Sequence, residues 1–266
     1  MAVINQAIIL AAGLGQRLRS RAASKPLTRV HAACLLEISM RQLIAAGITK
    51  IVVVTGYQAD QVEAEIDRLR ALLPAEIVAA RIDDWTRPNG WSVIAGAKQV
   101  EGPFVLVMAD HIFADGLLDA LAARVLAANM LEDCDAVLAT DRIDNPRIDH
   151  DDVTWVALDQ RGHIERIGKH IARFNAVDCG AFVATAGLPR AIATAIEQGL
   201  PGSLSDGMQV LARARRAASV DVAGAWWVDV DDPASLDLAL REAPAQIGWL
   251  QAERASQSSG VLHAVG

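Results

Sequence analysis

The chain has 266 residues, of which 52 % are hydrophobic, and it carries a formal net charge of −7. This length is compatible with one α/β domain, and the apolar fraction is ample for a buried core. The acidic balance argues against a nucleic-acid partner, because contact with a phosphate backbone needs a surplus of Lys and Arg.

Apolar runs typical of strands alternate with helical patterns through the first half of the sequence. Such alternation predicts a Rossmann-like α/β fold, in which a mostly parallel sheet is flanked by helices. Strands are expected at residues 7–11, 51–55, 77–82, 104–108 and 135–140. Helices are expected between them, at residues 35–46, 58–72, 92–100 and 117–130.

The pattern changes after residue 140. Residues 153–158 and 163–167 are separated by Asp-Gln-Arg-Gly, which predicts a hairpin within a small subregion at about 141–187. Further strands are expected at 181–184, 220–223 and 226–230, and helices at 188–198, 205–213 and 233–241. We therefore expect a single domain over residues 1–251, followed by a flexible Ser/Gln/Gly-rich tail at 252–266.

The most informative segment follows the first expected strand. It has the sequence Leu-Ala-Ala-Gly-Leu-Gly-Gln-Arg at residues 10–17, and Ser-Lys-Pro-Leu follows at residues 24–27. A strand that ends in a glycine-rich turn offers backbone N–H groups at close range to an anion. Arg17 and Lys25 add positive charge that is not easily lost. The segment therefore predicts a binding pocket for a polyphosphate.

Two other phosphate-binding motifs are absent from the sequence. A dinucleotide-binding fingerprint needs a third glycine where this chain has Leu18, and an acidic residue after the second strand, where it has Thr55-Gly56-Tyr57. The sequence contains no Walker A loop either. These absences argue against a dehydrogenase and against a kinase.

Two aspartates stand at the ends of apolar strands. Asp110 follows the fourth expected strand, and Asp229 lies near the end of the chain in Trp-Trp-Val-Asp-Val-Asp-Asp-Pro. Ligands of open α/β sheets lie at the carboxyl ends of strands, and Mg²⁺ prefers oxygen ligands, so this pair could hold Mg²⁺ against substrate phosphates. The alternative is an aspartate that caps the following helix, a role open to Asp231 or Asp232.

These segments resemble the signature of the nucleotidyltransferases that make sugar nucleotides and CDP-alcohols. That family has Leu-Ala-Ala-Gly-x-Gly-x-Arg, then Pro-Lys-x-Leu, an Asp after the fourth strand, and Trp-x-Asp near the end. The order and the separations match over about residues 7–240, with Ser24 where many members have Pro.

The resemblance implies a role for each matching residue. Arg17 and Lys25 would be catalytic, and Asp110 and Asp229 would hold Mg²⁺ as the cofactor. The implied nucleotide-binding residues are Leu10, Ala11, Ala12, Gly13, Gly15, Asn89, Gly90 and Ser92. His111 has no second histidine at metal-ligand spacing, so we expect it to be a structural group rather than a ligand.

Several segments look like one branch of this family, the CTP:inositol-1-phosphate cytidylyltransferases. They are Asn-Gly-Trp-Ser at 89–92, Asp-His-Ile-Phe at 110–113, the acidic run at 149–156, Ile-Gly-Lys at 167–169 and the run from 174 to 182. The acceptor-binding residues that this likeness implies, in the subregion at 141–187, are Lys169, Asn175, Asp178 and Gly180. The chain departs from the branch at Trp155, where the branch tends to carry Lys, and an aromatic face suits a quaternary ammonium group.

The branch resemblance implies transfer of CMP from CTP to a phosphorylated alcohol. Inositol 1-phosphate is the favoured acceptor, and the products would be a CDP-alcohol and pyrophosphate. The residues leave open the same chemistry on phosphocholine, an alkylphosphonate or a sugar 1-phosphate. They also leave open a non-catalytic nucleotide-binding protein, because this fold can survive the loss of activity.

Cysteine content and hydropathy lead to an expected location. Cys34, Cys134 and Cys179 stand far apart without a Cys-x-x-Cys motif, which favours reduced thiols in the cytoplasm. No apolar run of the sequence approaches the roughly 18 residues that a membrane span needs. Proteins of the inositol-phosphate branch often feed, or are fused to, a membrane phosphotransferase, and we expect any such partner of this chain to be separate.

Overall fold

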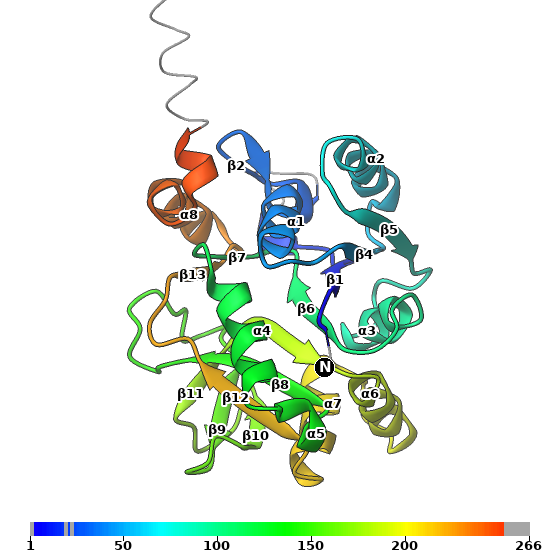
Figure 1. The fold of residues 1–266 in the computed structure, drawn as a ribbon, viewed down its shortest axis with the longest axis vertical. Coiled ribbons are helices and arrows are strands. Elements are labelled where there is room, and N and C mark those ends of the chain that lie inside the picture. Colours follow the sequence, from blue (N-terminus) through cyan, green and yellow to red (C-terminus); the bar gives the residue numbers. More distant parts are fainter. Residues whose placement is uncertain (1–2, 19–20, 22–23, 253–266) are drawn as a thin grey trace, which may run out of the picture.

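The computed structural model describes residues 3–18, 21 and 24–252, which form a central mixed sheet with helices on both faces (Figure 1). Within these residues the strand order is β10-β9-β11-β6-β1-β4-β5, and β8 pairs with β11 and β12 away from this path. The predicted α/β architecture is confirmed. Most of the predicted tail lies outside the described residues.

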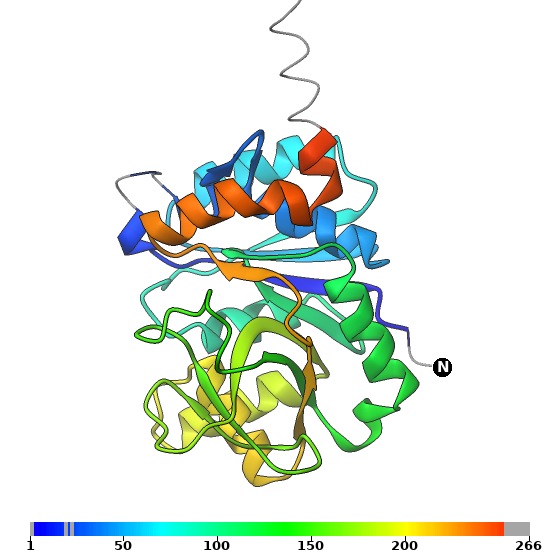
Figure 2. The same ribbon diagram turned by 90° about the vertical axis from the view of Figure 1, so that its left-hand side faces the viewer.

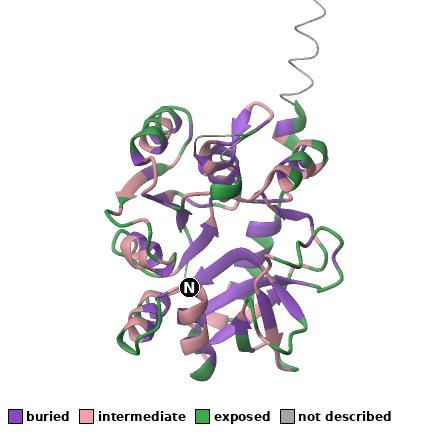
Figure 3. Ribbon diagram, turned by 180° about the vertical axis from the view of Figure 1, so that it is seen from behind, coloured by how far each residue is buried: buried purple, intermediate pink, exposed green. Residues whose placement is uncertain are grey.

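Four apolar strands form the parallel part of the sheet. They are β1 (Gln6–Ala11), β4 (Lys50–Thr55), β5 (Glu76–Arg81) and β6 (Phe104–Met108). β1 pairs in parallel with β4 and β6, and β4 pairs in parallel with β5. Helices cover both faces of β1 and β4, which is why these strands are continuous apolar runs and are buried along nearly their whole length (Figure 3).

Each of the two faces of the sheet has its own apolar cluster. Alternate residues of β1 supply the two clusters, Ile9 on one face and Ile8 on the other. The Ile9 face carries α1 (Leu35–Ala45), α2 (Ala59–Arg70) and α4 (Leu117–Ala127). The Ile8 face carries α3 (Gly90–Ala97), α6 (Gly187–Glu197) and α7 (Leu204–Arg213).

The second half of the chain extends the sheet with mainly antiparallel pairs. The added strands are β8 (Ala136–Asp141), β9 (Trp155–Leu158), β10 (Ile164–Gly168), β11 (Ala176–Ala184) and β12 (Ala217–Asp221). β9 and β10 form the predicted hairpin. β11 pairs antiparallel with β6, β8 and β9, so it runs from the parallel half of the sheet into the hairpin.

The bend in β11 explains why the sequence predicted only part of this strand. Gly180 has a φ of +76°, and the pairing register with β8 shifts between Asp178 and Phe182. A polar residue and a glycine at this irregularity interrupt the apolar pattern. The sequence therefore predicted a strand at 181–184, whereas β11 spans nine residues.

A two-stranded sheet joins two distant parts of the chain. β7 (His111–Phe113), which the sequence did not predict, pairs antiparallel with β13 (Trp227–Asp229), and Asp229 lies opposite His111. The amide of Val230 donates to the carbonyl of Asp110 at 2.9 Å. This ladder brings Asp110 beside Asp229.

The remaining elements are short or lie near the ends of the described chain. They are η1 (Gln16–Leu18), η2 (Lys25–Leu27), β2 (Arg29–Val30), β3 (Ala33–Cys34), α5 (Met130–Asp133) and α8 (Pro233–Gln246). α8 begins with a capping box between Asp232 and Ser235, and a third apolar cluster packs it beside α1 (Figure 2). Among the described residues, no helix combines the length and the apolar character that a membrane span requires.

Candidate active site

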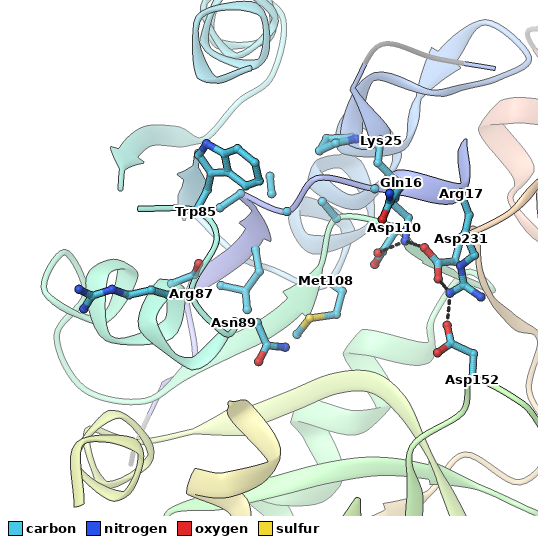
Figure 4. A pocket seen from close by; sticks show the side chains of 18 residues that line it. Gln16, Arg17, Lys25, Trp85, Arg87, Asn89, Met108, Asp110, Asp152 and Asp231 are labelled. Atoms are coloured by element: carbon cyan, nitrogen blue, oxygen red, sulfur yellow. Dashed lines mark hydrogen bonds and ion pairs between the residues drawn. The ribbon is translucent and has the colours of Figure 1, made fainter. Parts of the chain in front are cut away.

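A cavity of about 640 Å³ opens at the carboxyl ends of β1 and β6 (Figure 4). Its lining residues are Leu10, Ala11, Ala12, Gly13, Gly15, Gln16, Arg17, Lys25, Pro26, Trp85, Arg87, Asn89, Ser92, Met108, Ala109, Asp110, Asp152 and Asp231. Trp85 and Arg87 lie at one end, and the other end, called the charged end below, holds Arg17, Lys25, Asp110, Asp152 and Asp231 (Figure 4). Of the predicted nucleotide-binding residues, Gly90 alone does not line this cavity.

The glycine-rich turn lies directly against Lys25. Gly15 has a φ of +58°, and a Cβ at this position would collide with the side chain of Lys25. Glycine at residue 15 therefore satisfies both the backbone conformation and the close approach. Gly13 meets no such restriction, because a Cβ there would have nothing within 4 Å.

Arg17 and Lys25 are both paired with carboxylates at the charged end of the cavity. Nζ of Lys25 contacts Asp110 and Asp231, and it lies 3.8 Å from Oδ1 of Asp229. Arg17 contacts Asp152 and Asp231. Two residues from the glycine-rich half of the chain thus meet four aspartates from distant segments.

The sequence did not single out Asp152 or Asp231 as site residues. The prediction that Asp231 or Asp232 caps the last helix applies to Asp232, whose side chain accepts from the amide of Ser235 at 2.7 Å. Asp231 instead pairs with Lys25. Spacing along a strand could have found Asp231, because it shares the β-strand period of Asp229. Asp152 precedes β9 within an acidic run at 149–156 that resembles the inositol-phosphate branch, but nothing in that run distinguishes it from the neighbouring aspartates.

The carboxylates of Asp110 and Asp229 fit a divalent cation. Ligand atoms of Asp110, His111 and Asp229 lie within 4.8 Å of one another. Oδ1 of Asp229 is buried and has no hydrogen-bond partner. A buried carboxylate oxygen that makes no hydrogen bond, beside a second carboxylate, is a suitable donor set for Mg²⁺.

The two carboxyl groups have pKa values shifted in opposite directions. Burial alone would raise the pKa of Asp110, but Lys25 and His111 outweigh it and lower the value. Burial raises the pKa of Asp229, and the neighbouring Asp110 carboxylate adds to the effect, whereas His111 opposes it. Asp110 is therefore firmly ionised, and the charge on Asp229 is the less stable of the two.

His111 lies at the edge of the carboxylate pair. Its Nδ1 donates to Oδ1 of Asp110 at 2.9 Å, and its ring stacks on Trp227 with a centroid separation of 6.1 Å and an interplanar angle of 3°. Burial would lower its pKa, but Asp229 and Asp110 raise the value to about 9. Burial raises the pKa of the nearby Asp178 to about 6.

The other end of the cavity is formed by α3 and the segment before it. Asn89 lines the cavity while its Oδ1 accepts from the amide of Leu204 at 2.9 Å, so this side chain also joins α3 to α7. A Cβ at Gly90 would collide with the carbonyl of Gly202, so glycine at residue 90 allows α3 to lie close to the segment before α7. Ser92 is buried and also lines the cavity.

The four residues predicted to bind the acceptor lie outside this cavity. Lys169 lies beside a lining residue, because its Nζ contacts Asp152, which also contacts Arg17. The side-chain amide of Asn175 donates to and accepts from the backbone of Leu158, at 3.0 and 2.8 Å.

Asp178 and Gly180 lie close together in the bend of β11. The carboxylate of Asp178 accepts from the amide of Gly180 at 2.7 Å. The acceptor roles of these two residues, like those of Lys169 and Asn175, remain predictions.

Trp155, the first residue of β9, packs within an aromatic group. Its ring centroid lies 4.0 Å from that of Phe174 and 5.4 Å from that of His150. The residue is 8 % exposed. Little of the indole face is therefore open to a quaternary ammonium group.

Backbone amides, fixed positive charges and carboxylates suited to a divalent cation act together on polyphosphates in the enzymes that transfer phosphoryl and nucleotidyl groups. The fold and the cavity accordingly resemble those of nucleotide-dependent transferases. Residues 7–198 match the sequence model of the family described as "MobA-like NTP transferase domain", and the chain belongs to this family. The resemblance to nucleotidyltransferases is thereby confirmed.

Two curated relatives share the name "Bifunctional IPC transferase and DIPP synthase". The relative from Rubrobacter xylanophilus is 34 % identical and is matched over 91 % of this chain and 52 % of its own length. The relative from Aquifex aeolicus is 26 % identical over 89 % of this chain and 51 % of its own length. The chain therefore spans about half the length of these relatives.

Solved structures share the fold. One, described as the inositol-1-phosphate CTP transferase from T. maritima, superposes with a TM-score of 0.70 at 23 % identity, covering 91 % of this chain and 98 % of that one. This likeness confirms the predicted α/β nucleotidyltransferase fold.

Proposed function

We propose that this chain transfers CMP from CTP to inositol 1-phosphate, giving a CDP-alcohol and pyrophosphate. The main observation behind the proposal is that Arg17, Lys25, Asp110 and Asp231 contact one another at one end of a cavity that the glycine-rich turn also lines. The choice of substrates is supported by the T. maritima structure, whose description names inositol 1-phosphate and CTP. The names of the curated relatives, which contain "IPC transferase", agree with it.

The proposed reaction is an in-line displacement at the α-phosphorus of CTP. An oxygen of the acceptor phosphate forms a bond to this phosphorus, the bond to the bridging oxygen of the β-phosphate breaks, and pyrophosphate leaves with the electron pair. The acceptor phosphate already carries negative charge, so the step needs no general base. Positioning and charge neutralisation are then the main tasks of the protein.

Each cation in the site has a proposed task. The backbone from Ala12 to Gly15 would cradle the nucleotide, and Arg17 would hold the β- and γ-phosphates that leave. Lys25, which is 10 % exposed, would stabilise the charge that grows at the α-phosphate. Asp110 and Asp229 would hold Mg²⁺, which supplies charge neutralisation on the phosphates when bound.

Lys169 is the proposed partner of the acceptor phosphate. It shares the carboxylate of Asp152 with Arg17, so a cation of the acceptor side lies one side chain away from a cation of the nucleotide side. Two phosphate groups that replaced this carboxylate would lie close to each other, as the reaction requires. The packing of Trp155 against Phe174 disfavours phosphocholine, because a covered indole face offers little cation–π attraction.

We further propose that the reaction takes place in the cytoplasm. The three cysteines are buried free thiols, which suits a reducing compartment. The CDP-alcohol product would serve as the donor for a phosphotransferase that acts on a membrane alcohol.

Release of pyrophosphate tests the proposed function directly. The whole chain would be assayed with each nucleoside triphosphate against inositol 1-phosphate, phosphocholine, an aminoalkylphosphonate and a sugar 1-phosphate. We expect CTP with inositol 1-phosphate to give the highest kcat/KM. Another acceptor in first place would replace the substrate assignment, and the absence of release with every pair would favour a non-catalytic nucleotide-binding protein.

A further inference from the structure

The imidazole of His111 is held by residues on neighbouring strands at the edge of the cavity. His111 opens β7, and its ring lies parallel to the indole of Trp227 on β13. Its Nδ1 donates to Oδ1 of Asp110 at 2.9 Å. The side chain is 12 % exposed, so the surrounding packing restricts rotation of the ring away from this carboxylate.

Gly180 on β11 leaves the space that this ring occupies. A Cβ at residue 180 would fall 2.6 Å from Nε2 of His111, well inside van der Waals contact. The φ of +76° at Gly180 also favours glycine. The imidazole therefore lies between the bend of β11 and the indole of Trp227, with Nδ1 directed to Asp110.

We propose that His111 is a positioning residue that holds Oδ1 of Asp110 and so directs Oδ2, the oxygen that Nζ of Lys25 contacts, toward the cations of the site, the metal ion included. This inference rests on the proposed function, in which Asp110 and Asp229 hold Mg²⁺. Mg²⁺ demands near-octahedral geometry and takes few protein ligands, so a carboxylate restricted to one ligating oxygen suits it. Partners that orient metal ligands in this way are typically worth about 10- to 100-fold in metal affinity.

Two substitutions separate the hydrogen bond from the packing. His111→Phe keeps an aromatic ring between Gly180 and Trp227 but removes the donor to Asp110. His111→Asn removes the ring but keeps an N–H donor near the position of Nδ1. If His111 acts through packing alone, the phenylalanine variant should bind the metal better than the asparagine variant. If His111 positions Asp110, the asparagine variant should bind the metal better.

Binding of Mn²⁺ alone to the whole chain gives a readout that does not depend on turnover. The dissociation constant would be measured by water-proton relaxation at one fixed pH, alongside the Mg²⁺ concentration that gives half-maximal turnover. We expect His111→Phe to raise both about ten-fold, and His111→Asn to recover most of the loss. His163→Phe changes a histidine outside the cavity lining and serves as the matched control, with both values unchanged.

Gly180→Ala is an independent test of the same contact. The added methyl group would displace the ring of His111 and is expected to weaken Mn²⁺ binding. In the His111→Asn background there is no ring to displace, so the same substitution should have little further effect. Equal weakening in both backgrounds would assign the effect to backbone strain at residue 180 and would overturn the proposed contact.

The outcomes distinguish this inference from the proposed function. Unchanged Mn²⁺ binding in His111→Phe, with weakened binding in Asp110→Asn, would remove the positioning role and leave the metal site intact. Unchanged binding in both variants would overturn the metal site at Asp110, and the positioning role with it.

Discussion

Lys25 and Asp231 lie 206 positions apart in the chain, yet their side chains form an ion pair at the charged end of the cavity. Asp231 follows β13, whose pairing with β7 brings it to the glycine-rich turn. The same carboxylate also contacts Arg17. Asp231 thus pairs with both cations that are proposed to act on the triphosphate. Phosphate oxygens can contact Arg17 and Lys25 only by replacing carboxylate oxygens as their partners.

Removal of the Lys25 ammonium group is expected to lower kcat more than it weakens substrate binding. Lys25→Ala should lower kcat by about 100-fold or more, the usual cost of losing one group that stabilises transition-state charge. Pyrophosphate release measures this rate, and circular dichroism checks that the variant is folded. Lys98→Ala, which removes an exposed lysine, is the control. Near-normal turnover in a folded Lys25→Ala variant would refute its catalytic role.

Asp229→Asn should abolish Mg²⁺-dependent turnover without loss of stability. Burial raises the pKa of Asp229, so its ionised form is held at a cost to the folded state that a neutral amide does not incur. We therefore expect a Tm equal to or above that of the wild type in the presence of EDTA. Asp119→Asn, on the exposed side of α4, should change neither property. Full activity in Asp229→Asn would contradict its place in the metal site.

Asp152 competes with substrate phosphates for two cations, and its removal should tighten binding. In Asp152→Asn the side chains of Arg17 and Lys169 lose a charged partner. The KM for CTP should fall about three-fold, in line with the modest strength of partly exposed ion pairs. Steady-state kinetics measures the change, and Asp151→Asn, at an exposed neighbouring position, is the control. A higher KM would show that Asp152 orients Arg17 rather than competes for it.

The carboxyl group of Asp178 should make stability depend on pH. Burial raises its pKa to about 6, above the value of about 3.9 for an unfolded chain. A carboxyl group whose pKa is raised on folding stabilises the folded state at pH values below its pKa in the unfolded chain. This stabilisation is lost as the pH rises through the folded pKa of about 6. The Tm of Asp178→Asn relative to the wild type should therefore increase between pH 4.5 and pH 7.5, in the absence of divalent cations. A difference in Tm between the two proteins that stays constant over this pH range would exclude the raised pKa of Asp178.

Lys169 should contribute to acceptor binding more than to nucleotide binding. Lys169→Ala is expected to raise the KM for inositol 1-phosphate by about ten-fold or more, as for the loss of a hydrogen bond from a charged group, and to change the KM for CTP less. Lys50→Ala, a partly exposed lysine paired with Glu76, is the control. If phosphocholine has a higher kcat/KM than inositol 1-phosphate, the acceptor assignment fails.

The parts of the fold and site that depend on local sequence could be predicted. β1 and β4 are apolar runs because both of their faces are covered, and this pattern is visible without the fold. The glycine-rich turn, Lys25 and Asp110 were found because each follows directly from a strand end or a short motif. These residues do meet at one cavity.

The remaining site residues depend on contacts that only the fold creates. Asp152 stands in an acidic run and Asp231 beside a helix cap, and no sequence pattern links either of them to Arg17 or Lys25 until the fold brings them together. Asn175 stands within a family-like run, yet its amide bonds the backbone of Leu158. A short polar side chain can bond a backbone group or a substrate, and sequence alone does not distinguish these partners.

β11 has a consequence for how acceptor preference can change in proteins built this way. The same strand pairs with β6 near the nucleotide turn and, on the other side of its bend, with β9 in the hairpin, so one strand joins both halves of the site. Loops of the hairpin can be replaced, lengthened or recruited from elsewhere while that strand keeps its place in the sheet. Grafting experiments that exchange residues 142–175 and retain β11 should therefore transfer acceptor choice, whereas junctions cut within β11 should cost folding.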